Sequence, residues 1–303
     1  MTKTPSPLDL TNRTEPVEQA IIGGRSLWED ARARLMRNKA AVTSMIVLGI
    51  LVLFAVIGPF IWVHPYHQIS EASQIDPTLE NLHILGTDLQ GRDLFARLMI
   101  GLRISLLVGV VATFVSLIIG VLWGATAGYL GGSVDNLMMR FVDVLYALPF
   151  IFFVILLLTV FERNIVLIFA AIGAIEWLTM ARIVRGQTLA IKGKEFIEAA
   201  RAAGVSRRAI ILRHILPNVI GPVAVYVTLT IPVVILAESF LSFLGLGVNE
   251  PLTSLGVLIS EGANVMSEKP WMLIAPATTM GVTLLCLNFI GDGLRDALDP
   301  KDR

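Results

Sequence analysis

Long apolar runs without a charged side chain divide this sequence into segments that could each cross a bilayer. A helix needs about 20 such residues to span roughly 30 Å of hydrocarbon. Five runs meet this requirement, and a weaker sixth run is interrupted by Glu176. The pattern therefore predicts an all-α membrane protein with six transmembrane helices, at residues 41–63, 104–129, 135–161, 164–182, 218–244 and 271–290.

Lys and Arg gather in the segments that six spans would place on one side of the membrane. With the N-terminus inside, the cytoplasmic segments hold 19 of the 24 Lys and Arg residues, and omitting the span at 164–182 destroys this pattern. Positively charged loops are retained on the cytoplasmic side. We therefore expect a multi-pass protein with both termini in the cytoplasm and a basic cytoplasmic loop at 183–217.

Residues 1–40 are predicted to form a cytoplasmic tail ahead of the six-span domain at 41–303. The end of this tail places apolar and basic residues on opposite faces of a helix, which is typical of an amphipathic helix on the inner leaflet. No small-residue cleavage site follows the first apolar run, so we interpret that run as a span and not as a removable signal peptide. The residues of the two helix faces are Leu27, Trp28, Ala31 and Leu35, opposite Arg32, Arg34 and Arg37.

The composition supports a lipid environment. Of the 303 residues, 55% are hydrophobic and 16% are charged, and the mean hydropathy is +0.74, which is unusual for a soluble domain. The formal net charge of zero gives no indication of a nucleic-acid partner. The single cysteine, Cys286, lies in the last apolar run and excludes an intrachain disulfide.

Glycines and prolines inside the predicted spans indicate where helices pack closely or bend. Gly120, Gly124 and Gly128 are four residues apart, a spacing that lets another helix backbone approach. Pro149 should kink or unwind the span at 135–161, which makes it a candidate pathway or gate residue.

Two acidic residues lie inside predicted spans, where an ionisable group costs about 2.5–3.5 kcal/mol on insertion scales and is often functional. Glu176 lies near the inner end of its span and Glu238 near the outer end of its own, so each can reach an interface. We predict pathway, gate or structural roles for both. The alternative that these residues support is a proton-coupled secondary carrier.

The basic segment at 183–217 is predicted to form two short helices at an angle on the cytoplasmic face. The first carries Phe196 as an exposed aromatic beside small residues, and Gly204 suits a left-handed stop after it. Ser206 can cap a second helix, which should end ahead of Pro217. The alternative interpretation is an amphipathic loop that rests on lipid head groups.

Six positions of this segment form a recognisable pattern: Glu198, Ala199, Ala200, Gly204, Leu216 and Pro217. The pattern resembles the cytoplasmic loop of permease subunits in bacterial ABC-type importers. In that family the loop docks in a cleft of the ATP-binding subunit, so the resemblance implies that these residues and Phe196 couple the chain to an ATPase. His214 stands where the family often has isoleucine, a small departure that leaves the docking assignment unchanged.

Further segments match the same family, at 85–88, 91–93, 131–135, 238–247 and 292–300. The resemblance covers roughly residues 25–303 and points to the dipeptide, oligopeptide and nickel branch. Details at 25–28, 195–198 and 288–291 are most similar to the C-type permease subunits of oligopeptide importers. Dipeptide and nickel importers are the alternatives.

The resemblance implies a type I importer permease fold in the bacterial inner membrane and an assembly of five parts. This chain would work with a second homologous permease, two ATP-binding subunits and a periplasmic or extracellular peptide-binding protein. Oligopeptides would be the substrate, and the partner ATPases would use ATP and Mg²⁺. Glu238 could then meet the ammonium group of a peptide in the outer vestibule.

No motif indicates an enzyme or a cofactor site in the chain itself. Gly193-Lys194 is the nearest approach to a phosphate-binding loop, but Gly186 stands too far before it and Glu195 replaces the Ser or Thr that would bind Mg²⁺. Paired-Cys and His-Glu-x-x-His patterns are also absent. We therefore expect a transport subunit without catalytic residues, bound metal or an ATPase site.

Overall fold

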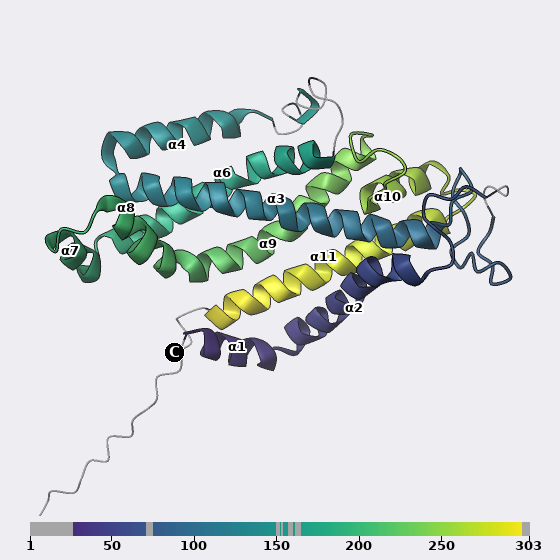
Figure 1. Ribbon diagram of the computed structural model, residues 1–303, viewed down its shortest axis with the longest axis horizontal. Coiled ribbons are helices and arrows are strands. Elements are labelled where there is room, and N and C mark those ends of the chain that lie inside the picture. The colour runs from purple at the N-terminus through teal and green to yellow at the C-terminus, as the bar shows by residue number, and fades with distance from the viewer. Residues whose placement is uncertain are drawn as a thin grey trace, which may run out of the picture.

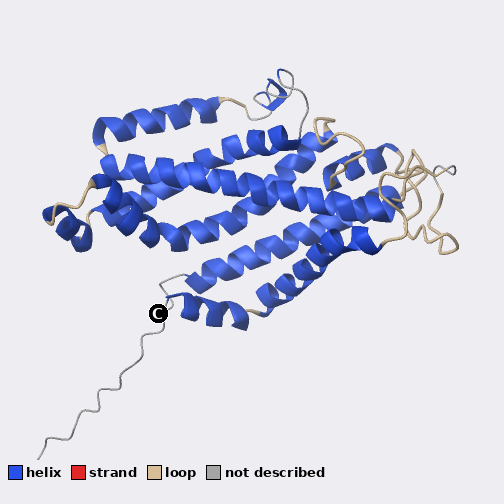
Figure 2. Cartoon of the chain, in the orientation of Figure 1, coloured by secondary structure: helices blue, strands red, loops and turns tan. Residues whose placement is uncertain are grey.

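The computed structural model describes residues 27–70, 75–149 and 165–298, together with positions 152, 154–156 and 160. Helices build this part of the chain, and no named strand forms within it (Figures 1 and 2). The helices are α1 Leu27–Arg37, α2 Lys39–Ile61, α3 Leu94–Leu130, α4 Gly132–Ala147, α6 Ile165–Lys192, α7 Glu195–Ala202, α8 Arg207–Ile210, the π-helix η1 Ile211–Ile215, α9 Leu216–Phe243, α10 Leu255–Asn264 and α11 Trp271–Leu298.

Four helical segments of the described residues are long and apolar enough to cross a membrane: α2, α3, α11 and the continuous stretch Arg207–Phe243 that contains α9. They correspond to four of the six predicted spans. The predicted span at 164–182 lies within α6, and the one at 135–161 begins as α4 but continues largely outside the described residues. The all-helical fold is confirmed, whereas the number of six spans stays a prediction.

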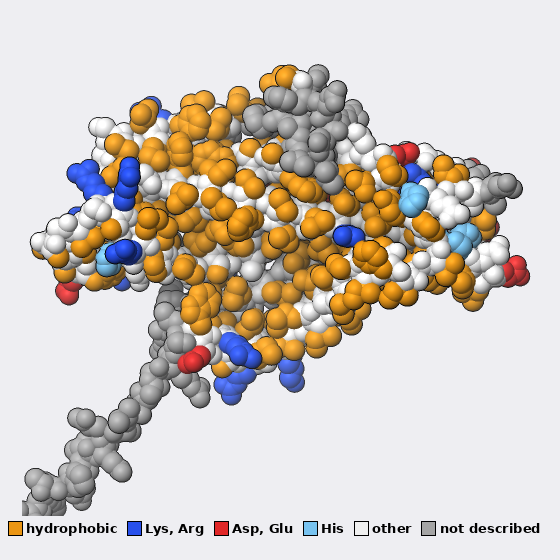
Figure 3. Space-filling model, in the orientation of Figure 1, with side chains coloured by type: hydrophobic (Ala, Val, Ile, Leu, Met, Phe, Trp, Pro, Cys, Tyr) orange, Lys and Arg blue, Asp and Glu red, His pale blue; other side chains and the backbone are white. Residues whose placement is uncertain are grey.

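The long helices run roughly along the long axis of the molecule, and most loops gather at the end opposite α7 (Figures 1 and 2). In the view of Figure 3, hydrophobic side chains cover the middle of the molecule. Lys and Arg side chains gather around α1 and around the end that carries α7 and α8, whereas acidic and His side chains are visible at both ends. An apolar belt between two polar ends is the surface that a bilayer requires.

α1 is a helix at the end of the N-terminal tail, where the sequence predicts an amphipathic helix. It packs on α2 and α11. A Cβ atom added at Gly293 of α11 would lie only 2.6 Å from the Cβ of Ala41 and 3.1 Å from Leu35 Cδ1. The absence of a side chain at Gly293 therefore lets the junction of α1 and α2 rest directly on α11.

The glycine spacing in α3 marks its close contact with α6, as predicted. A Cβ at Gly124 would lie 2.3 Å from the Ala181 carbonyl oxygen, and one at Gly128 would lie 2.8 Å from Thr188 Cβ. α4 is joined to α6 by a pair of hydrogen bonds from the Arg185 guanidinium to the two carboxylate oxygens of Asp135, at 2.6 and 2.7 Å. α3, α4 and α6 therefore form one packed unit.

Gly124→Ala is expected to destabilise the protein by about 1–3 kcal/mol, because the added methyl group meets a backbone oxygen that cannot move unless α3 and α6 separate. Gly221→Ala in α9 is the matched control, since nothing lies within 4 Å of its added Cβ; it should be neutral or slightly stabilising. Thermal unfolding in detergent compares the two variants. Equal unfolding midpoints would contradict the close packing.

A buried ion-pair network closes the end of the bundle opposite α7. Arg97 of α3 is 0% exposed and donates to Asp88 at 2.5 Å and to Glu261 of α10 at 2.5 and 2.9 Å. Arg92 donates to the same Asp88 at 2.8 Å. Burial lowers the pKa of Arg92, but the hydrogen bond and the charge of Asp88 raise it above its ordinary value overall. The network ties the loop before α3 to α10, a helix in a segment that the sequence analysis interpreted as a loop.

Candidate functional site

The cytoplasmic segment predicted to bind an ATPase begins with a helix that has a complete C-terminal cap. α7 ends at Ala202, and Gly204 adopts a φ of +76°, the left-handed conformation predicted for it. The Gly204 N–H donates to the Arg201 carbonyl at 3.0 Å, and the Val205 N–H donates to the Ala200 carbonyl at 3.1 Å. This is the Schellman arrangement, and it fixes the direction in which the chain leaves α7.

α7 packs against the protein with one face and exposes the other. Ile197 is 0% exposed and Ala200 is 8% exposed, and both belong to an apolar cluster with residues of α3, α6, η1 and α9. Phe196 is 41% exposed, and Glu198 and Ala199 are exposed beside it. α7 is therefore held by its buried face while an aromatic ring and a carboxylate face outward.

The second helix of the segment does not end ahead of Pro217, which corrects the sequence prediction. It begins after Ser206, whose hydroxyl accepts the Ala209 N–H at 3.4 Å, and it passes through the π-helix η1 into α9. Leu216 opens α9 and packs on the same apolar cluster. Pro217 lies in the first turn of α9, and the change of hydrogen-bond register in η1 just before it accommodates the missing N–H.

Basic side chains hold α7 and its neighbours against the inner end of α3. Lys192 Nζ donates to the Gly128 carbonyl at 3.4 Å, and the Arg201 guanidinium lies 5.2 Å from the centroid of the Tyr129 ring. A cation is favourable both at a helix C-terminus and over an aromatic face. These residues border a polar cavity of about 440 Å³. The sequence indicated the positive charge of this segment but not these individual contacts.

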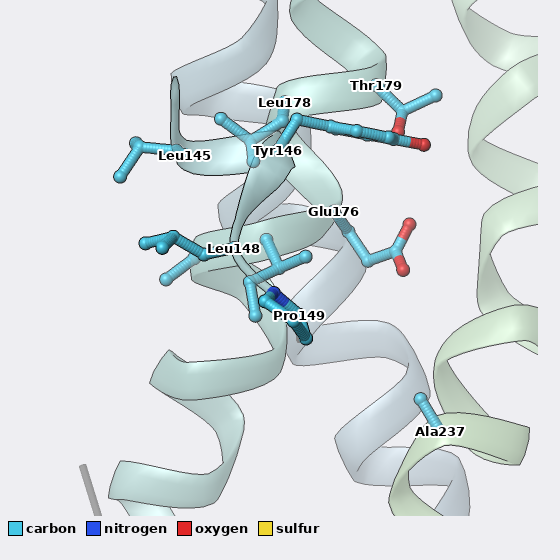
Figure 4. A pocket seen from close by; sticks show the side chains of 10 residues that line it. Leu145, Tyr146, Leu148, Pro149, Glu176, Leu178, Thr179 and Ala237 are labelled. Atoms are coloured by element: carbon cyan, nitrogen blue, oxygen red, sulfur yellow. The ribbon is translucent and has the colours of Figure 1, made fainter. Parts of the chain in front are cut away.

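Pro149 and Glu176, predicted as pathway or gate residues, line one cavity between α4, α6 and α9 (Figure 4). The backbone leaves α4 at Leu148, with φ −74° and ψ 127°, the extended conformation that a following proline favours. Glu176 projects from α6 into the open space. The structure thus brings together two residues that are 27 positions apart in the sequence.

Glu238 lies away from this cavity, in a setting that the sequence analysis missed. It is 1% exposed, and its carboxylate accepts hydrogen bonds from Ser105 Oγ at 3.1 Å and from Ser242 Oγ at 2.6 Å. Ser254 Oγ donates to the Ser242 oxygen at 3.2 Å. The carboxylate therefore joins α3, α9 and the start of α10. One signal was available, because Ser242 follows Glu238 by one helical turn; the pathway role of Glu238 stays a prediction.

Two sequence families match the chain. Residues 26–82 match the N-terminal transmembrane domain of oligopeptide transport permease C. Residues 116–303, more than half of the chain, match the binding-protein-dependent transport system inner membrane component. The chain belongs to this second family. The resemblance inferred from the segment around Glu198 and from the flanking motifs is therefore confirmed.

Individual relatives of this transport-system family match nearly the whole chain. It is 56% identical to the oligopeptide transport system permease protein OppC of Haemophilus influenzae, over 95% of this chain and 93% of that protein. It is also 56% identical to OppC of Escherichia coli K12, over 97% of each. Identity to the dipeptide transport system permease protein DppC of Bacillus subtilis is 44%, over 92% of this chain and 87% of that protein.

The fold is shared with a chain from an inward-facing structure of the MetNI methionine ABC transporter. The TM-score is 0.55 at 16% sequence identity, over 66% of this chain and 94% of that chain. Together with the family match, this likeness gives the chain a type I importer permease fold. Family membership and the apolar helices make it a multi-pass subunit of the inner membrane, and they imply ABC subunits and a substrate-binding protein as partners.

Among the described residues, no group of three or more His, Cys, Asp or Glu side chains is placed to hold a metal ion. α7 presents an anchored contact surface at one end of the molecule, and the Glu176 cavity presents one carboxylate between helices.

Proposed function

We propose that this chain is the permease subunit of an ATP-driven importer that carries oligopeptides across the bacterial inner membrane. The observation that carries the proposal is the 56% identity to oligopeptide permeases over at least 95% of the chain. A dipeptide or nickel importer is the alternative. The chain has six spans and cytoplasmic termini, as the distribution of Lys and Arg supports.

The proposed importer contains four further subunits. A second, homologous permease completes the pathway, and a periplasmic binding protein delivers the peptide. Two ATP-binding subunits use ATP and Mg²⁺, whereas this chain binds neither. α7 docks in a cleft of one ATP-binding subunit, with the exposed Phe196 ring as the anchor and Glu198 directed at a basic partner residue.

The way α7 is attached supports a mechanical role in this assembly. Its buried face packs on the cluster shared with α3 and α6, and η1 joins the segment to α9 without a break. When ATP binding closes the two ATPases, the pull on α7 therefore reaches the spans through rigid contacts. The translocation pathway between the two permeases then opens outward. ATP hydrolysis then returns the spans to the inward-open arrangement.

The composition of the native assembly tests the proposed function. The chain carries a tag at its C-terminus and is purified in mild detergent from its native membrane, and its companions are identified by mass spectrometry. We expect stoichiometric recovery of a second permease and of P-loop ATPases, and the reconstituted assembly should import oligopeptides only with ATP and a loaded binding protein. Recovery of a homo-oligomer that takes up substrate under a proton gradient would instead identify a secondary carrier.

A further inference from the structure

A cavity of about 420 Å³ lies between α4, α6 and α9, and Glu176 is the only carboxylate among the described residues that line it. This volume falls in the range of small-ligand sites. Figure 4 shows the Glu176 carboxylate pointing into the space on the side where α9 carries Ala237, with the Tyr146 ring extending towards Thr179. Apart from the hydroxyl groups of Tyr146 and Thr179 and the Glu176 carboxylate, the described side chains that line the cavity are apolar.

No residue in the described part of the chain donates a hydrogen bond or contributes an ion pair to Glu176. The nearby Arg182 of α6 is engaged elsewhere: its NH2 group donates to Asp143 at 2.8 Å, and its guanidinium lies 4.3 Å from the centroid of the Tyr146 ring. Glu238, by contrast, is already satisfied by serine hydroxyls. Because a carboxylate within a predicted span is costly unless it is neutralised, the Glu176 cavity suits a cation that comes from outside the chain.

The proposed substrate supplies such a cation. Oligopeptides of different sequence share only their backbone, a terminal carboxylate and a terminal ammonium group, which has three N–H donors. The cavity offers acceptors in the Glu176 carboxylate and the hydroxyl oxygens of Thr179 and Tyr146. Resting on the function proposed above, we propose that Glu176 binds the N-terminal ammonium group of the peptide during its passage.

Uptake by the reconstituted complete importer tests this assignment. Two peptides of one sequence are compared, one with a free N-terminus and one with an N-formyl group. Each is supplied at ten times its measured Kd for the binding protein, so that both are loaded equally. The variants are Glu176→Gln, which removes the charge, and Glu176→Asp, which keeps it. Glu268→Gln, at an exposed carboxylate outside the predicted spans, is the matched control.

Glu176→Gln should lower uptake of the free peptide about tenfold, the loss expected for one hydrogen bond to a charged group, and should leave uptake of the formylated peptide unchanged. Glu176→Asp should retain most of the preference for the free peptide over the formylated peptide, and Glu268→Gln should behave like the unmodified protein. An equal loss with both peptides, or no loss with either, would overturn the assignment. If the unmodified importer carries neither peptide, the proposed function itself is wrong.

Discussion

Replacing Phe196 with alanine is expected to abolish ATP-driven uptake while the chain remains folded in the membrane. The ring is 41% exposed on a helix whose opposite face is buried, so it is available to a partner and contributes little to the fold of this chain. Burying an aromatic side chain at an interface contributes about 1.5–3 kcal/mol, so its loss should weaken docking about ten- to a hundredfold. Peptide uptake and ATP hydrolysis, measured together in proteoliposomes, should become uncoupled.

Two further substitutions distinguish a loss of docking from a loss of folding. Phe196→Leu keeps an apolar side chain and should retain part of the uptake. Ile197→Ala removes a side chain that is 0% exposed and should instead lower the free energy of unfolding by about 2–5 kcal/mol. If Phe196→Ala takes up peptide at the normal rate, Phe196 does not anchor the ATPase contact.

Arg97→Met is expected to lower the free energy of unfolding by about 3–5 kcal/mol. The change removes the guanidinium that Asp88 and Glu261 share, and it leaves two carboxylates at the buried site with Arg92 as the remaining partner of Asp88. Denaturant unfolding in detergent measures the loss, and the double variant with Asp88→Asn should recover part of it.

Arg103→Met is the matched control for this prediction. Arg103 lies on the same helix and is half-buried, but within the described residues it has no ion-pair partner. Its replacement should change stability far less. Equal losses from the two substitutions would show that the ion-pair network does not hold this end of the bundle together.

Local signals in the sequence predicted the helical elements and the shape of α7. Charge-free runs located the long helices, and the spacing of Gly120, Gly124 and Gly128 indicated a close approach of another helix, which the structure identifies as α6. Gly204 marked the end of α7 because few other residues adopt its left-handed conformation without strain. These features depend on residues within a few turns of one another, so a single sequence contains them.

Features that depend on distant residues were not predictable. Arg97 and Glu261 are 164 positions apart, and nothing in either neighbourhood indicates the other. The helix α6 also continues past the predicted end of its span at residue 182 to Lys192, because charged residues end an apolar run without ending a helix. Pro217 suggested a helix end because proline lacks the N–H that a helix interior needs. The prediction was wrong because the π-helix η1, which accommodates this proline, cannot be recognised from composition.

The unbroken helix from Arg207 to Phe243 has 37 residues, so it is about 55 Å long, well beyond the roughly 30 Å thickness of the hydrocarbon core. A helical segment of this length extends beyond the hydrocarbon core. In the proposed orientation, this segment connects the cytoplasmic end, where α7 is attached, to the opposite end, where the Glu238 carboxylate bonds to serines of α3 and α9 next to the start of α10. A displacement at one membrane surface can thus be transmitted to the other along a single helical segment.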